Sequence, residues 1–136
     1  MMVRAATADD LAAIAAIQEA SPEASQWDPA SYLGYECSVA TSGGRVAGFL
    51  VVRQIGPGER EILNLAVDPP ERRRGVARKL LETELRRAKN HWFLEVRASN
   101  SAAMKLYESA GFRMAGRRDS YYSNPLEPGI VMKFES

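Results

Sequence analysis

A short basic segment at residues 72–77, RRRGVA, has the residue types of a phosphate-binding loop. It follows an apolar run that ends at Asp68-Pro69-Pro70, and Gly75 opens a clear helical pattern behind it. A loop that leaves a strand and enters a helix points unpaired N–H groups at one place, where the helix dipole adds about half a positive charge. Gly75 lacks the Cβ that would hold a ligand away, and Ala77 is also small. These residues suit the binding of a di- or triphosphate.

Side-chain charge in this segment comes from Arg72, Arg73, Arg74 and Arg78, whose guanidinium groups suit anionic oxygens. Neither G-x-x-x-x-G-K-[ST] nor G-x-G-x-x-G is present, which excludes the two common nucleotide-binding loops. A lone basic turn is more often only a solvated surface turn that leads into a helix. The strand–loop–helix setting is what favours a phosphate site here.

The elements that must position this loop follow from hydrophobic periodicity and turn residues. Strands are predicted at residues 2–5, 37–40, 46–53, 61–67, 92–97, 112–118 and 129–134. Helices are predicted from a capping-box-like start at Thr7 and Asp10 to about Glu19, at 30–35, from Gly75 onward and at 102–110. A polar loop containing Tyr121 and Tyr122 joins the last two strands. The order β-α-α-β-β-β-α-β-α-β-β is a mixed α/β (α+β) fold with helices on a mostly antiparallel sheet.

The chain as a whole narrows the classes of function. Its 136 residues suit a single domain, 1–136, and its net charge of +1 offers no field that attracts polyanions. Cys37 is the only cysteine, so we expect no internal disulfide and no metal site built on thiolates. There is no apolar core of a signal peptide and no run near the ~20 residues of a membrane span. We therefore expect a cytoplasmic protein with no membrane or direct nucleic-acid partner.

Arg72-x-x-Gly75-x-Ala77 matches the [Q/R]-x-x-G-x-[G/A] signature of the GNAT acetyltransferase superfamily. A second, longer segment, LEVRASNSAAMKLYESAGF at residues 94–112, resembles the RimI-type N-terminal protein acetyltransferases, which modify the terminal alanine of a ribosomal protein. The resemblance implies a GNAT fold with six to seven strands and about four helices. It also implies acetyl-CoA as the acetyl donor.

The resemblance assigns roles along the chain. Glu95 is implied as the general base and Tyr107 as the acid that protonates the departing thiolate. Asn100 is implied to contact the pantetheine arm. The implied coenzyme-binding residues are Leu65, Ala66, Val67, Arg72, Arg73, Arg74, Gly75, Val76, Ala77, Arg78 and Asn100. Within this set, the main chain of 65–67 would face pantetheine and the Val67 N–H would polarise the acetyl carbonyl.

Each catalytic candidate also has a plain structural interpretation. Glu95 is on the face of its strand opposite Leu94, where a carboxylate often pairs with a neighbouring arginine. Tyr107 could pack against the sheet as an ordinary aromatic residue, and a phenol proton near pKa ~10 needs no large tuning to reach a thiolate near ~8.5. Asn100 suits a helix N-cap, a role compatible with ligand contact.

The acceptor is less well defined by the sequence. Trp27, Tyr121 and Tyr122 are candidates for a peptide channel. RimI-type chains usually carry Glu-Asp-Ala before the final strand, and this chain has Glu127-Pro128-Gly129. The leading hypothesis is acetylation of a protein N-terminus, and the alternatives are acetylation of a small amine or a non-catalytic acetyl-CoA-binding regulator. A monomer or a homodimer is compatible with each of these three hypotheses.

Overall fold

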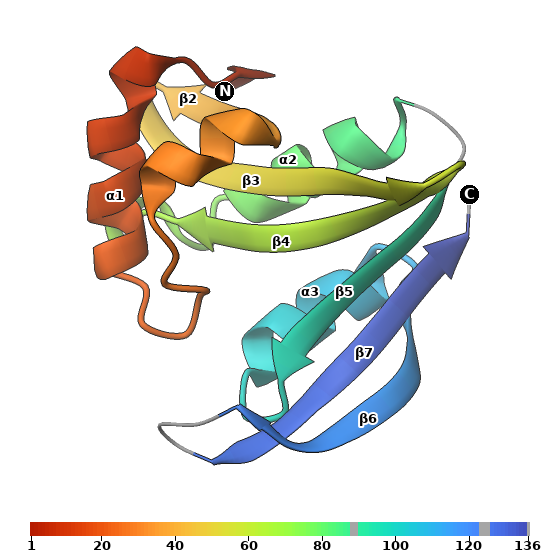
Figure 1. Cartoon of the computed structure of the whole chain (residues 1–136). Coiled ribbons are helices and arrows are strands. Elements are labelled where there is room, and N and C mark those ends of the chain that lie inside the picture. Colours follow the sequence, from red (N-terminus) through yellow and green to blue (C-terminus); the bar gives the residue numbers. More distant parts are fainter. Residues whose placement is uncertain (88–89, 123–125, 136) are drawn as a thin grey trace.

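Seven strands form one sheet in the order β1-β2-β3-β4-β5-β7-β6 within the described part of the chain, in a computed structural model (Figure 1). The structure describes residues 1–87, 90–122 and 126–135, with the main chain alone at 120 and 121. The strands are β1 (Met2–Ala5), β2 (Glu36–Ser42), β3 (Arg45–Gly56), β4 (Glu59–Val67), β5 (His91–Arg97), β6 (Arg113–Tyr122) and β7 (Glu127–Glu135). The helices are α1 (Leu11–Glu19), α2 (Val76–Leu85) and α3 (Ser101–Ser109), with 3₁₀ turns η1 (Ala8–Asp10), η2 (Pro29–Gly34) and η3 (Pro69–Glu71).

The predicted order of elements and the mixed, mostly antiparallel fold class are confirmed. The prediction that Tyr121 and Tyr122 lie in a loop is wrong, because β6 continues to Tyr122. The ladder is irregular between Arg118 and Tyr122, but Tyr122 pairs with Glu127 of β7. Aromatic residues suit a pleated, half-buried strand when a partner strand is present, and here β7 is that partner.

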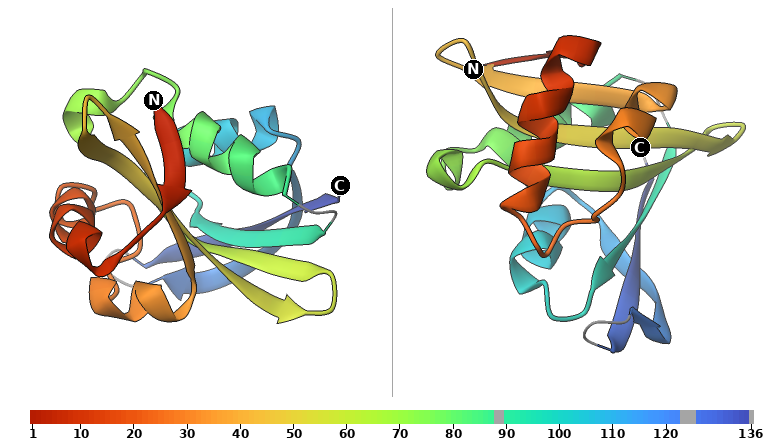
Figure 2. Two further views of the ribbon diagram at one scale, coloured as in Figure 1. Left: turned by 90° about the horizontal axis from the view of Figure 1, so that it is seen from above. Right: turned by 60° about the vertical axis from the view of Figure 1, so that its left-hand side comes forward.

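Helices cover both faces of the sheet. Figure 2 shows α2 and α3 on one face and α1 with η2 on the other. The core on the α2–α3 side includes Leu80, Trp92 and Met132, whereas the core on the α1 side includes Ile14 and Phe49. Buried positions alternate strictly along β5, because successive side chains of a strand point to opposite faces. Trp92, Leu94 and Val96 are buried and belong to the core on the α2–α3 side.

The sheet opens between β4 and β5. These two strands pair in parallel only through Glu59–Glu61 and His91–Phe93, and then diverge (Figure 1). Gly48 of β3 lets the start of α2 pack close to this point, because a Cβ at Gly48 would lie 3.0 Å from Val76 Cγ1 and 2.9 Å from the Ala66 oxygen. The end of β4, the start of α2 and the end of β5 therefore surround one opening.

The N-terminal helix is anchored by one carboxylate. Asp10 accepts bonds from both terminal nitrogens of Arg4, at 2.8 and 2.9 Å, and from the Thr7 N–H at 2.8 Å, which completes the predicted capping box. The bonds from Arg4, followed by the Thr7 N–H, hold the pKa of Asp10 at about 2.

We expect Asp10→Asn to lower the free energy of unfolding by about 1–2 kcal/mol at neutral pH, since a cap and a charge-assisted bond are lost. The folded pKa lies below the unfolded one, so this stability is present above about pH 4 and is lost as pH falls toward about 2. Urea unfolding should show the gap to the parent protein closing over that range. Asp9→Asn, at the exposed neighbouring position, is the control, and a gap independent of pH would contradict the assignment.

Candidate active site

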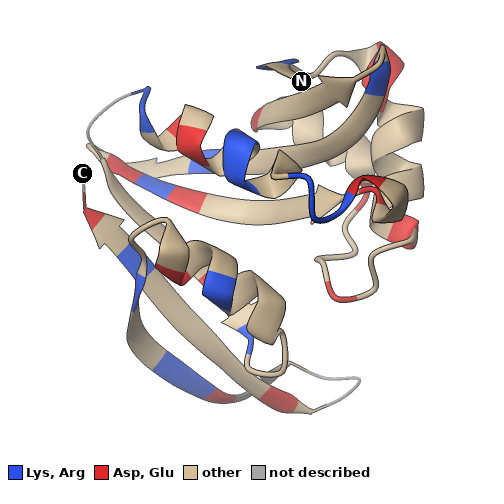
Figure 3. Ribbon diagram, turned by 180° about the vertical axis from the view of Figure 1, so that it is seen from behind, with Lys and Arg blue, Asp and Glu red and all other residues tan. Residues whose placement is uncertain are grey.

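The loop between β4 and α2 has the backbone geometry typical of an anion-binding loop. Arg73 has φ 65° and Gly75 has φ 79°, so the chain turns through left-handed conformations immediately before α2 begins. Alternating backbone conformations of this kind turn successive N–H groups toward one concave point, and the helix N-terminus adds positive potential. A Cβ at Gly75 would meet no protein atom within 4 Å, so the glycine borders open space. In Figure 3 the blue loop before α2 marks the arginines of this segment.

A cavity of about 570 Å³ lies beside this loop, between α2 and α3. Its lining contains almost all of the predicted coenzyme-binding residues, namely Leu65, Ala66, Val67, Arg72, Arg73, Gly75, Val76, Ala77, Arg78 and Asn100. Arg74 is not in the lining, and its guanidinium lies 3.4 Å from Glu71. The lining of this cavity extends from the loop before α2 to Tyr107 on α3.

The arginines of the loop have different partners. Arg72 donates to the Val67 carbonyl at 3.1 Å and to Ser21 Oγ at 3.0 Å, and it lies 3.2 Å from Glu23. Arg78 bridges α2 to α3 by donating to Ser109 Oγ at 2.8 Å. Arg73 makes no hydrogen bond or ion pair with a described residue, so its guanidinium is available to a ligand.

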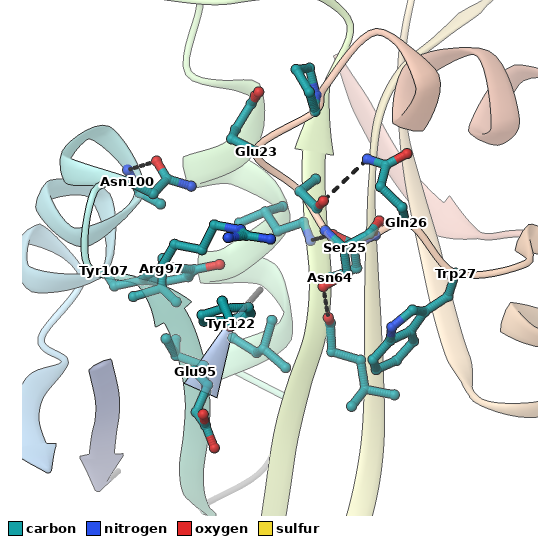
Figure 4. Close-up of a pocket in the computed structure, with 18 residues that line it drawn as sticks. Glu23, Ser25, Gln26, Trp27, Asn64, Glu95, Arg97, Asn100, Tyr107 and Tyr122 are labelled. Atoms are coloured by element: carbon teal, nitrogen blue, oxygen red, sulfur yellow. Dashed lines mark hydrogen bonds between the residues drawn. The ribbon is translucent and has the colours of Figure 1, made fainter. Parts of the chain in front are cut away.

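A second cavity, of about 360 Å³, lies in the opening between β4 and β5. Figure 4 shows its walls: the segment with Gln26 and Trp27 on one side, the strand with Glu95 and Arg97 on the other, and Tyr122 between Glu95 and Arg97. Trp27 and Tyr122, two of the predicted acceptor residues, line it, and the side chain of Tyr121 is outside the described residues. The two cavities share Glu23, Leu65, Asn100, Ala103 and Tyr107. They therefore meet around Tyr107.

Tyr107 is buried and its ring contacts Phe112 edge-on, with centroids 5.6 Å apart. Burial, with a smaller contribution from Tyr122, raises the pKa of its hydroxyl above the usual value. The phenol is thus a weaker acid than the sequence alone suggested, and it stays protonated throughout the neutral range. Tyr107 thus packs in the core and also lines both cavities.

Glu95 lies on β5 and lines the second cavity. Its Oε1 accepts a bond from Arg118 Nη1 at 2.5 Å, while Oε2 is buried and has no hydrogen-bond partner among the described residues. In Figure 4 the carboxylate points away from Asn100 and Glu23. The arginine pairing considered from the sequence is therefore present, and Glu95 also borders the cavity.

Asn64, which no sequence pattern singled out, organises one wall of the second cavity. Its Oδ1 accepts from the Leu65 N–H at 3.0 Å and the Ser25 N–H at 3.3 Å, and its Nδ2 donates to the Ser25 carbonyl at 3.0 Å and to Tyr32 Oη at 3.1 Å. These bonds fix the 22–27 loop against β4. The available signal was a single amide in the apolar strand EILNLAV, because a buried polar group must find partners.

Glu127 lines neither cavity but holds a turn that does. Its carboxylate accepts from the Ser99 N–H at 3.0 Å and from Ser99 Oγ at 2.8 Å, and these bonds hold the pKa of Glu127 below its usual range. Asn100, which follows Ser99, caps α3 by accepting a bond from the Ala103 N–H at 3.2 Å. Asn100 also lines both cavities. The C-terminal hairpin thus holds the β5–α3 turn where the cavities meet.

The structure also bears on a cysteine nucleophile, a metal site and a membrane span. Burial raises the pKa of the Cys37 thiol to about 11, which makes a thiolate nucleophile unfavourable. Within the described ranges, no group of three or more His, Cys, Asp or Glu side chains is placed to hold a metal ion. No helix of the described chain is long and apolar enough to cross a membrane.

A sheet that opens beside a basic loop, with two cavities that meet at a buried tyrosine, fits a group-transfer enzyme with a phosphate-bearing donor. The acetyltransferase (GNAT) family matches residues 6–112, and the chain belongs to this family. It is accordingly an N-acetyltransferase, and GNAT enzymes use acetyl-CoA as the donor.

Individual relatives agree with this assignment. The [ribosomal protein bS18]-alanine N-acetyltransferase of Escherichia coli strain K12 is 41% identical over 108 residues, which span 74% of this chain and 70% of the relative. The N-alpha-acetyltransferase RimI of Mycobacterium tuberculosis is 40% identical over 101 residues, 71% of this chain and 64% of the relative. The crystal structure of the ribosomal-protein-S18-alanine N-acetyltransferase from Escherichia coli matches with a TM-score of 0.84 and 31% identity, over 98% of this chain and 92% of that one.

Proposed function

We propose that the protein transfers the acetyl group of acetyl-CoA to the N-terminal α-amine of a protein, of the ribosomal-protein-alanine type. The observation that carries this proposal is the meeting of the two cavities at Tyr107, with Leu65 and Asn100 in both walls. The donor occupies the cavity beside the phosphate loop, and the acceptor enters the cavity walled by the 22–27 loop. The relatives named for ribosomal protein bS18 supply the acceptor class.

On the donor side, Arg73 and the main chain around Gly75 hold the pyrophosphate. The open space beside Gly75 supports close approach by the phosphates. The end of β4 has β3 on one side and the opening on the other, which supports contact between its main chain and the pantetheine arm. The Val67 N–H polarises the acetyl oxygen from this strand.

Glu95 acts first, because the acceptor amine arrives mostly protonated at neutral pH, with a pKa of about 7.7–8.0. The carboxylate removes one proton from the ammonium group. Since it points away from Asn100 and is held by Arg118, a water molecule carries that proton to it. The neutral nitrogen then forms a bond to the acetyl carbon as the carbon–sulfur bond breaks.

Tyr107 completes the transfer. Its phenol gives a proton to the departing thiolate, and the remaining extra proton on the amide nitrogen passes to the phenolate, which restores the tyrosine. Glu95 releases its proton to solvent. The balance is one ammonium and one thioester consumed, and one amide, one thiol and one proton produced.

A substrate panel tests the proposal. Thiol release from acetyl-CoA is followed with peptides that begin with a free alanine, with the same peptides blocked at the N-terminus, and with an amino acid, a polyamine and an aminoglycoside. We expect turnover on the free peptides and none on the blocked ones. Turnover confined to the small amines would contradict the proposal and would show that the acceptor is a small amine.

A further inference from the structure

Arg118 reaches Glu95 across an intervening strand. β6 and β5 are separated by β7, and the register places Arg118 opposite Gly129, which in turn lies opposite Arg97 on β5. Glu95 lies two residues before Arg97, on the same face of the strand. Gly129 is buried and carries no side chain, so β7 leaves room for the arginine to cross and donate to Glu95 Oε1 at 2.5 Å.

The basic residue closest to Glu95 along its own strand face is engaged elsewhere. Arg97 Nη1 lies 3.5 Å from Glu127, and the Arg97 guanidinium carbon lies 4.5 Å from the centre of the Tyr122 ring. Both contacts hold Arg97 toward the β6–β7 end of the sheet. The cation that contacts the Glu95 carboxylate is therefore Arg118, which is 23 residues further along the chain.

The two oxygens of Glu95 are in different situations. Oε1 is fixed by Arg118, whereas Oε2 is buried without a hydrogen-bond partner among the described residues. A buried carboxylate oxygen without a partner is costly unless a water, ligand or proton satisfies it. A carboxylate that is hydrogen-bonded at one oxygen and not at the other has one defined atom that can accept a proton.

We propose that Arg118 is the positioning residue of the reaction: it holds Glu95 through Oε1 and leaves Oε2 as the atom that takes the acceptor's proton. This inference rests on the proposed role of Glu95 as general base. It makes β6 part of the catalytic apparatus, although β6 lies at the edge of the sheet. The Arg118 side chain is 53% exposed, so its removal opens no cavity in the core.

The first test is Arg118→Ala, assayed on an alanine-initiated peptide. We expect kcat to fall about 10- to 100-fold, a part of the roughly 10²–10⁴-fold that a positioned general base contributes. The KM for acetyl-CoA should stay within about twofold, because Arg118 is remote from the donor cavity. Arg117→Ala is the matched control, since Arg117 precedes Arg118 and pairs with Asp119 at 2.7 Å. Equal unfolding midpoints would confirm that both variants are folded.

A double-mutant cycle separates positioning from general damage. In a Glu95→Gln background, Arg118→Ala should cause no further loss, because the group it positions is already disabled. Arg118→Lys should recover part of the rate by restoring one donor. An additive loss in the cycle, an unchanged rate or a faster Arg118→Ala enzyme would overturn the inference. If Glu95→Gln itself retained the full rate, the proposed base would fail instead, so the two failures are distinguishable.

Discussion

Replacing Tyr107 by phenylalanine is expected to lower kcat by about 10²-fold or more, within the range for loss of a general acid, with little change in the KM for acetyl-CoA. Phenylalanine keeps the ring that packs on Phe112 and removes only the hydroxyl that borders both cavities. Single-turnover measurements with a peptide acceptor would assign the loss to the transfer step.

The pH dependence gives a second check on Tyr107. The acid must be protonated to act, and burial raises the pKa of its hydroxyl above the usual value of about 10. Loss of activity through Tyr107 is therefore expected only above about pH 10. Tyr35→Phe is the matched control, because Tyr35 is exposed and lines neither of the two cavities. A Tyr107→Phe enzyme as fast as the parent would place the proton donor elsewhere.

Elements with strong local signals could be predicted from the sequence. The amphipathic stripe after Gly75 became α2, and the alternation in WFLEVR became β5 with Trp92 and Leu94 buried. The C-terminal hairpin was harder, because the end of a strand depends on its partner as well as on its own residues. Tyr122 belongs to β6 because Glu127 of β7 pairs with it, and the local pattern does not specify that pairing.

The strand–loop–helix turn at residues 72–77 was predictable for the same reason, since it is a local motif. The partners of individual charged residues were not. Arg72 was expected to serve phosphates, yet its guanidinium contacts Ser21 and Glu23, about fifty residues earlier in the chain. The contact of Arg118 with Glu95 depends on the register of three strands. Such contacts follow from topology, which spacing along the sequence does not determine.

Glu95→Gln is expected to lower kcat/KM for a peptide by about 10²- to 10³-fold at neutral pH, because glutamine keeps the shape of the side chain but accepts no proton. The KM for acetyl-CoA should not change. Glu61→Gln is the control: this carboxylate lies on the neighbouring strand β4, pairs with Arg53 at 2.7 Å and lines neither cavity. A loss of similar size in the control would indicate a general electrostatic effect.

The deficit of Glu95→Gln should shrink as pH rises, and this distinguishes a base from a structural carboxylate. Above the pKa of the acceptor amine the neutral form is supplied by solvent, so the base becomes dispensable. For an α-amine that happens near pH ~8, whereas for an alkyl amine such as a lysine side chain it requires about pH 10.4. The pH at which the parent and variant rates converge therefore reports the class of acceptor as well as the role of Glu95. A deficit that stays constant to about pH 9.5 on a peptide N-terminus, well above the α-amine range, would exclude Glu95 as the base that deprotonates the ammonium group.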